Sequence, residues 1–253
     1  MVREPDPLLR LLWRHQLPDD QPRAAPRRGR RQQLSVDQVV ATAIDLADHL
    51  GLAKLSMRTL AERLGLGTMS LYTYLPGRDE LLVLMVDQVW TTSDRPALPD
   101  DLRARWELLA RTEYADLRAH PWILEADEGR PWLGPGAVGR YEWQLSALDG
   151  LGLDDIEMDQ TVTLLTGFAA SIVRGEQRLR RSEQASGMTE AQWWEANAAE
   201  LARVTAGHEH PLADRVGSAA GAAYQAATDP ARQLDFGLAR IVDGLLAHIG
   251  RAG

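Results

Sequence analysis

The sequence predicts an all-α protein with a small N-terminal helical unit and a larger helical body. Apolar residues recur every three or four positions along most of the 253-residue chain, which is the spacing of one helix face. No segment alternates apolar and polar residues as a half-buried strand does. Gly and Pro residues separate the apolar stretches at short intervals, so many helices of ordinary length are expected.

Four helices are predicted in the N-terminal third. Ser35 and Ser56 are placed to cap the first and second of them, and Gly51 and Gly65 to end them. Pro76 and the glycine after it break the third. The predicted ranges are 35–50, 56–64, 68–75 and 78–90. The second and third helices, joined by a short glycine-containing turn, have the form of a helix-turn-helix.

The rest of the chain is predicted to be helical throughout, after a hinge marked by Pro96 and Pro99. Pro230 suits the first turn of the last helix. The predicted ranges are about 100–119, 122–128, 136–149, 155–185, 189–205, 212–226 and 230–250.

Charge is unevenly distributed along the chain. The net charge is −8, but residues 1–90 hold 12 basic and 11 acidic residues, while the remainder holds 16 and 25. Residues 1–33 are rich in Pro and Arg and are expected to be disordered. Their arginine run has no acidic residue before Asp37, and such a run is typical of an arm that binds phosphates; the alternative is a solvated tail. The run consists of Arg23, Arg27, Arg28, Arg30 and Arg31.

Several classes of protein are disfavoured. The chain has no cysteine, which excludes disulfides and thiolate chemistry. The longest strongly apolar run, 81–86, is too short to span a membrane, and the acidic N-terminus does not resemble a signal peptide, so a cytoplasmic protein is expected. His208 and His210 lack further metal ligands, and solvated loop histidines are the preferred interpretation. Because no catalytic motif is present, neither an enzyme nor a cofactor is predicted.

The segment Leu55 to Leu82, LSMRTLAERLGLGTMSLYTYLPGRDELL, closely resembles the N-terminal segment of TetR-family regulators. The agreement extends over 34–86 and includes the Leu71-Tyr72 pair and the Pro-Gly-basic start of the fourth helix. More loosely, Ala119-His120-Pro121-Trp122 and Phe236-Gly237-Leu238 look like parts of the family's C-terminal domain. The resemblance implies an N-terminal arm (1–33), a DNA-binding domain (34–80) and a ligand-binding and dimerisation domain (81–253).

The free face of the third helix carries short polar groups and methyls that can reach base edges or phosphates. It has no Arg, Asn or Gln, so Arg58 on the second helix is the candidate for a guanine contact, as the matched family position implies; a phosphate contact is the alternative. By resemblance, Tyr72 and Tyr74 lie near the DNA backbone, although Tyr72 could instead be structural. Arg78 is placed to bind a phosphate. The predicted DNA-binding residues are Arg27, Arg28, Arg30, Arg31, Lys54, Arg58, Thr68, Met69, Ser70, Tyr72, Thr73, Tyr74 and Arg78.

The resemblance also implies a cavity for a small molecule, enclosed by the helices at 78–90, 100–119, 136–149 and 155–185. The alternative for each aromatic candidate is plain core packing. The predicted ligand-binding residues are Trp90, Tyr114, Trp122, Tyr141, Leu145, Leu165 and Phe168.

The helices at 155–185 and 230–250 are apolar on more than one side, which a helix packed only within its own chain does not need. By resemblance they form a four-helix dimer interface, and the alternative is that both are central in a large monomer. The predicted interface residues are Ile172, Leu234, Leu238, Ile241 and Leu245. The leading hypothesis is a repressor that an unidentified small molecule releases from a palindromic DNA operator. The alternative is a ligand-blind, dimeric DNA-binding or architectural protein.

Overall fold

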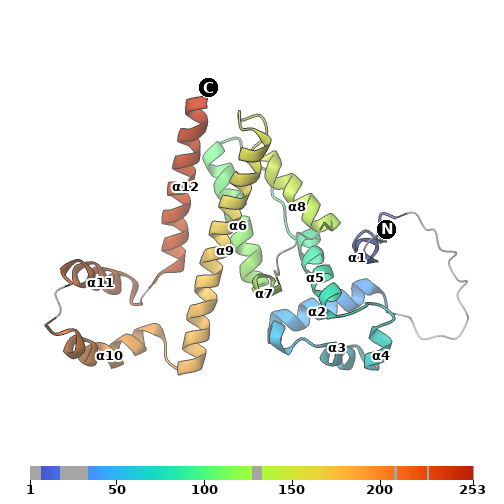
Figure 1. The fold of residues 1–253 in the computed structure, drawn as a ribbon, viewed down its shortest axis with the longest axis horizontal. Coiled ribbons are helices and arrows are strands. Elements are labelled where there is room, and N and C mark those ends of the chain that lie inside the picture. Colours follow the sequence, from blue (N-terminus) through green and yellow to red (C-terminus); the bar gives the residue numbers. More distant parts are fainter. Residues whose placement is uncertain (1–6, 18–33, 127–132, 208–209, 227, 253) are drawn as a thin grey trace, which may run out of the picture.

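The structure, a computed structural model, describes residues 7–17, 34–126, 133–207, 210–226 and 228–252. Within these ranges every regular element is a helix, which confirms the predicted all-α class (Figure 1). None of these helices is long and apolar enough to cross a membrane.

The head comprises α2 (Val36–Leu50), a short 3-10 turn (Leu52–Lys54), α3 (Met57–Leu64) and α4 (Thr68–Leu71). The predicted caps are confirmed. The Ser35 side chain accepts from the backbone of Gln38, the Ser56 side chain accepts from that of Thr59, and Gly65 ends α3 in the left-handed conformation with φ 68°. The third helix is shorter than predicted, because 72–75 form tightened turns before Pro76.

The helix α5 (Arg78–Thr92) leads from the head into the body (Figure 1). The described part of the body contains seven more helices, and each matches a predicted one within a few residues. They are α6 (Leu102–Ala119), α7 (Ile123–Ala126), α8 (Pro135–Ser146), α9 (Asp155–Ser186), α10 (Glu190–Thr205), α11 (Pro211–Tyr224) and α12 (Pro230–Ala252).

Two apolar clusters hold the described part of the chain together. The first joins the head to α1 and α5 and to parts of α6, α7 and α9. The second is built from α6, α8, α9 and α12, with Trp106 fully enclosed. Leucines close the core of the head: Leu60, Leu71 and Leu75 are buried in the first cluster, and Leu64 and Leu66 pack against it. That core fixes the orientation of α4 on the head.

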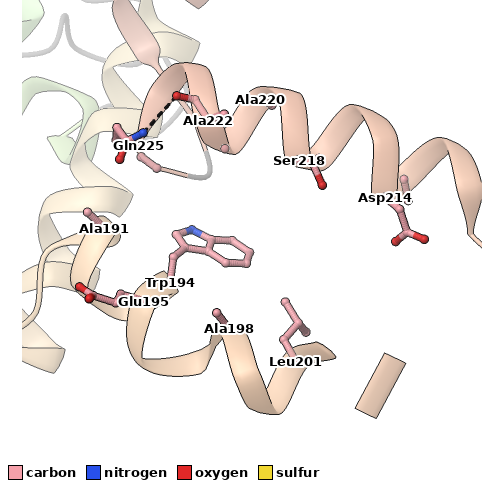
Figure 2. A pocket seen from close by; sticks show the side chains of 14 residues that line it. Ala191, Trp194, Glu195, Ala198, Leu201, Asp214, Ser218, Ala220, Ala222 and Gln225 are labelled. Atoms are coloured by element: carbon pink, nitrogen blue, oxygen red, sulfur yellow. Dashed lines mark hydrogen bonds between the residues drawn. The ribbon is translucent and has the colours of Figure 1, made fainter. Parts of the chain in front are cut away.

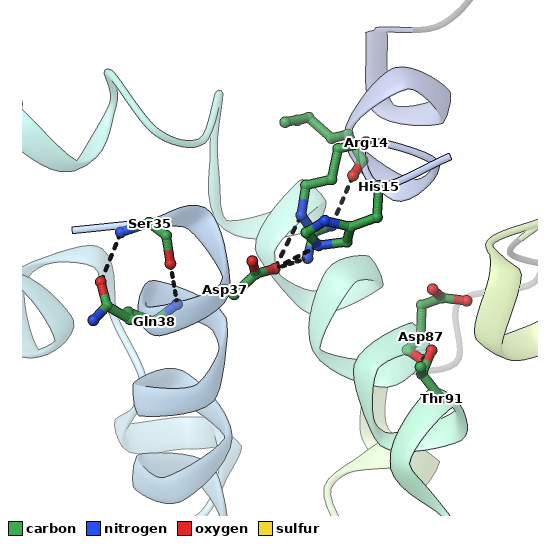
Figure 3. Close-up of polar contacts among 8 residues, drawn as sticks. Arg14, His15, Ser35, Asp37, Gln38, Asp87 and Thr91 are labelled. Atoms are coloured by element: carbon green, nitrogen blue, oxygen red, sulfur yellow. Dashed lines mark hydrogen bonds and ion pairs between the residues drawn. The ribbon is translucent and has the colours of Figure 1, made fainter. Parts of the chain in front are cut away.

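The expectation of disorder for residues 1–33 is wrong for 7–17. Here α1 (Pro7–Leu12) and the turns after it pack against α5, with Leu12 3% exposed in the first cluster. Arg14 and His15 point to Asp37 at the start of α2 (Figure 3), with Arg14 Nε 3.1 Å from a carboxylate oxygen. The Trp13 indole donates to the carbonyl of Leu133 in the body, 2.7 Å away. The helix α1 and the turns after it therefore link head and body.

Candidate DNA interface and effector site

The outer surface of the head carries most of the predicted DNA-binding side chains. Met69 is 79% exposed, and Ser70, Tyr72 and Thr73 are exposed beside it, while Thr68 is half-buried. Because α4 is held by a leucine core, this row of side chains has a fixed direction. A helix presented in this way suits the major groove of DNA.

Arg58 lies on α3 with its side chain 82% exposed, and its Nε donates to Glu62 at 2.9 Å. An exposed ion pair of this kind contributes little to stability. The guanidinium can therefore exchange Glu62 for a DNA acceptor at low cost.

The two tyrosines differ. Tyr72 is exposed, whereas Tyr74 is partly buried and packs against the first apolar cluster, and a DNA contact by Tyr74 stays a prediction. Tyr72 is two residues away and points elsewhere, as the helical rotation between them requires.

Two predicted phosphate contacts lie near the start of α5. Arg78 is exposed, and its guanidinium reaches the carbonyls of Leu52 and Leu55, each at 3.4 Å. The exposed Lys54 lies in the 3-10 turn between these two carbonyls. Arg27, Arg28, Arg30 and Arg31 lie outside the described residues.

The seven predicted ligand-binding residues do not gather at one place. Trp90, Tyr114 and Trp122 belong to the first apolar cluster, and Leu145, Leu165 and Phe168 to the second. Tyr141 is exposed and donates to Asp159 at 2.8 Å. Trp122 is buried and donates to Asp48 of the head. Trp90 and Tyr114 are the members best placed between α5, α6 and α9.

A buried charged cluster that was not predicted from the sequence lies against Trp90. Arg140 on α8 stacks on the Trp90 ring, 3.7 Å from its centroid, pairs with Glu113 and lies 2.8 Å from Asp116 on α6. Burial, together with the nearby Arg95, lowers the pKa of Arg140 to about 9, so the group stays charged at neutral pH. Burial raises the pKa of Asp116, which a hydrogen bond from Ser93 partly offsets.

We call Trp90, Glu113, Asp116 and Arg140 the body cluster. Enclosing charges is costly, and replacing them with apolar groups is often neutral for stability. Perturbed ionisable groups in an interior are therefore candidates for a functional site. The Glu113 and Asp116 spacing, one turn apart on one helix face, was the available sequence signal.

Asp87 connects α5 to α8. Its carboxylate accepts from the backbone amide of Ala137 at 3.0 Å, at the start of α8 (Asp87 is shown in Figure 3). A Cβ at Gly134 would lie 2.2 Å from that carboxylate, and a Cβ at Gly136 2.1 Å from the Asp87 carbonyl. Both glycines therefore permit the close approach of the two helices.

The pKa of Asp87 predicts a pH-dependent effect on stability. Burial raises this pKa, although amides of Ala137 and Gly136 and the charge of Arg14 act against the rise. The folded state thus binds the proton more tightly than the unfolded state, and the carboxylate lowers stability as pH rises above its unfolded pKa of about 4. Asp87→Asn keeps an acceptor for α8 and should raise Tm at pH 7.5 by about 2–4 °C.

The gain from Asp87→Asn should shrink as pH falls toward about 4, where the wild-type carboxyl also becomes neutral. Thermal unfolding across this pH range measures it. Asp149→Asn, at an exposed carboxyl, is the matched control and should change Tm little. A lower Tm for Asp87→Asn at pH 7.5 would contradict the interpretation.

A groove of about 850 Å³ lies between α10 and α11 (Figure 2). Trp194 and Leu201 on α10 face small residues of α11, among them Gly217 and Ala220. Neither of these two fully described helices has a buried residue. The groove lies apart from all seven predicted ligand-binding residues.

The predicted dimer stripe faces inward. Ile172, Leu234 and Leu238 are buried among helices of the same chain, and Ile241 and Leu245 pack against the second cluster. The large apolar side chains that α9 and α12 expose are instead Ile156, Leu164 and Phe236, with Phe236 68% exposed. The stripe faces inward because α12 packs closely on α9. A Cβ at Gly237 of α12 would lie 2.3 Å from the Phe168 ring of α9.

Comparisons with known proteins agree with this architecture. Residues 95–249 match the family described as "Tetracyclin repressor-like, C-terminal domain". The chain is 38% identical over 222 residues to the HTH-type transcriptional repressor DrrR1 of Streptomyces coeruleorubidus, covering 87% of this chain and 80% of that protein.

Two solved structures of ActR from Streptomyces coelicolor are similar. The apo form has a TM-score of 0.64 at 26% identity, and the form in complex with actinorhodin has 0.67 at 27%; each alignment covers 88% of this chain and 100% of ActR. The helix-turn-helix head, the helical body and these relatives together show that the chain belongs to the TetR family of DNA-binding transcriptional regulators.

Proposed function

We propose that this protein is a homodimeric repressor that binds a palindromic operator and is released by a small molecule bound in its body. The proposal depends on one observation above all: Met69, Ser70, Tyr72 and Thr73 form an exposed row on α4 and the turn after it. Buried leucines hold this segment in a fixed orientation. The repressor relative and the actinorhodin-bound ActR structure support repression and release by a ligand. We further propose that the protein acts in the cytoplasm and has no catalytic activity.

The proposed effector site lies between α5, α6, α8 and α9, at the body cluster. Trp90 offers an aromatic face there, and Glu113, Asp116 and Arg140 offer polar groups. A mainly apolar interior with a few converging polar groups is the usual composition of a small-molecule site. Of the seven candidates from the sequence, Trp90 and Tyr114 remain in this proposal as lining residues. The other five lie outside it: Leu145, Leu165 and Phe168 in the second apolar cluster, and Trp122 and Tyr141 elsewhere.

Selection from random duplex DNA, followed by sequencing, tests the proposal. We expect an inverted repeat whose half-sites lie about 34–36 Å apart, because major grooves on one face of B-DNA recur at that distance. A compound screen for release of the selected duplex then tests the effector. Failure to enrich any sequence would contradict the proposal. Operator binding that no compound relieves would favour a ligand-blind DNA-binding protein.

The arginine run is expected to strengthen DNA binding through phosphates or the minor groove. Deleting residues 1–32 would also remove Leu12 from the core, so substitution is the cleaner test. Changing Arg27, Arg28, Arg30 and Arg31 to Gln should weaken operator binding and flatten its salt dependence by about one unit of slope per lost phosphate contact. The preferred sequence should not change. A fluorescence titration at several salt concentrations measures this, and an unaltered slope would reduce the run to a solvated tail.

A further inference from the structure

A second contact between head and body lies away from α5, at the corner between α6 and α7. Asp48, near the end of α2, receives hydrogen bonds from two residues of this corner. The Trp122 indole Nε1 donates to Asp48 Oδ1 at 2.6 Å, and Nδ1 of His120 lies 2.8 Å from the same oxygen. We call Asp48, His120 and Trp122 the corner joint.

Trp122 is the enclosed member of the corner joint, and Asp48 and His120 are more accessible. Trp122 is 2% exposed, and the side chains of Asp48 and His120 are about three-quarters buried, at 25% and 26% exposed. The two rings of the corner meet edge to face, 6.1 Å between centroids. A hydrogen bond to a carboxylate is stronger than a neutral one, and a buried indole N–H that loses its acceptor is penalised. The head is therefore held here in one orientation.

The same corner is bound to the body on its other side. Gln177 on α9 donates to the carbonyl of Pro121 at 2.7 Å, and Arg181 on α9 pairs with Glu125 on α7. The backbone N–H of His120 donates to the carbonyl of Asp116 at 2.9 Å. Because Asp116 belongs to the body cluster, one continuous chain of contacts runs from that cluster to α2.

There is room for the corner to move. A cavity of about 320 Å³ adjoins it, lined by Leu50 and Gly51 of the head and by Arg180 and Gln184 of α9, besides joint residues. Switching between two packed arrangements requires space for one element to move relative to another. The cavity provides that space between α2 and α9.

We infer that Asp48 is a positioning residue that transmits the state of the body cluster to the recognition helix, in parallel with α5. A change at Asp116 moves His120 and the corner, and Asp48 passes the movement to α2, on which α3 and α4 are packed. The inference rests on the proposed function, in which a movement of α2 and the recognition helix releases the operator.

The distance between the two heads of a dimer tests this inference without an effector. The chain has no cysteine, so Ala41→Cys on the exposed side of α2 allows one nitroxide label per protomer. Pulsed electron–electron double resonance measures the distance between the two labels. It should give one narrow distance distribution for the labelled dimer that carries no other substitution. Asp48→Ala and, separately, Trp122→Phe should each broaden it roughly twofold, because α5 alone then orients the head. In these variants the loosened heads must become ordered when they bind DNA. The free energy of this ordering should weaken binding of the selected operator about tenfold.

Two matched variants separate positioning from general damage. Asp48→Asn keeps an acceptor for the indole N–H, so the width of its distance distribution should stay close to that of wild type. Asp45, one turn earlier on α2, pairs within the described residues with exposed His49 and Arg63, so the distance distribution of Asp45→Ala should also stay narrow. If Asp48→Ala lowers helicity, the inference is tested with Trp122→Phe, which keeps an aromatic ring and removes the N–H that donates to Asp48.

Unchanged widths for Asp48→Ala and Trp122→Phe would overturn the inference, as would equal broadening by Asp48→Asn or Asp45→Ala. If the proposed function is wrong, the selection from random duplex DNA will enrich no operator. The distance measurement does not depend on that selection.

Discussion

Phe236→Glu is expected to dissociate the dimer into folded monomers and to weaken operator binding by at least about a hundredfold, since each monomer reads only one half-site. Phe236 is the large apolar side chain that α12 exposes most, and Leu164 is exposed on α9, which packs against α12. A desolvated, unpaired carboxylate in an apolar interface is strongly unfavourable. Light scattering at micromolar concentration and a fluorescence titration with operator measure the two effects.

Val138→Glu, an exposed apolar position on α8, is the control and should leave both mass and affinity unchanged. Leu238→Glu is not a usable interface variant, because Leu238 is 1% exposed inside the protomer and the charge would unfold the body. A Phe236→Glu protein that remains dimeric would place the interface on another surface, such as α10 and α11.

Arg58→Ala is expected to weaken operator binding about 5–150-fold, corresponding to ~1–3 kcal/mol for a lost base contact. Stability should change little, because the side chain is 82% exposed. If Arg58 reads a guanine, selection with the variant should relax one position of each half-site. If it binds a phosphate, affinity should fall uniformly and the salt slope should drop by about one.

Arg111→Ala provides the matched control for Arg58→Ala. Arg111 pairs with Asp235 on the body surface at 2.8 Å, much as Arg58 pairs with Glu62, but it lies away from the head. Its removal should leave operator affinity unchanged. A wild-type affinity and sequence preference in Arg58→Ala would remove this residue from the DNA interface.

Local signals predicted most of the fold. Ser35 and Ser56 cap helices through side-chain hydrogen bonds with their own N-terminal turns, and Gly65 supplies a left-handed residue, so neighbours in sequence determine these boundaries. The helix at 7–12 was not predicted, because its Pro- and Arg-rich surroundings are typical of disorder. Its stability depends on Leu12 packing against α5, a contact between distant parts of the chain.

The candidate sites were harder to predict because helical periodicity shows which faces are apolar and not which partner covers them. The stripe with Leu234 and Leu238 is apolar, yet it packs on α6 and α9 within one chain. Similarly, Trp122 was chosen as an aromatic candidate, but Asp48, 74 positions earlier, determines its role. Long-range pairs such as Arg140 with Glu113 leave no periodic signal.

We propose that effector and operator compete through one conformational equilibrium, which a reciprocal titration can test. The affinity of a releasing compound is measured by calorimetry with the free dimer and with the dimer saturated by operator. Linkage requires operator DNA to weaken compound binding by the same factor by which the compound weakens operator binding; a hundredfold effect corresponds to ~2.7 kcal/mol. We expect equal factors in the two directions, and identical compound affinities with and without operator would contradict competition between effector and operator.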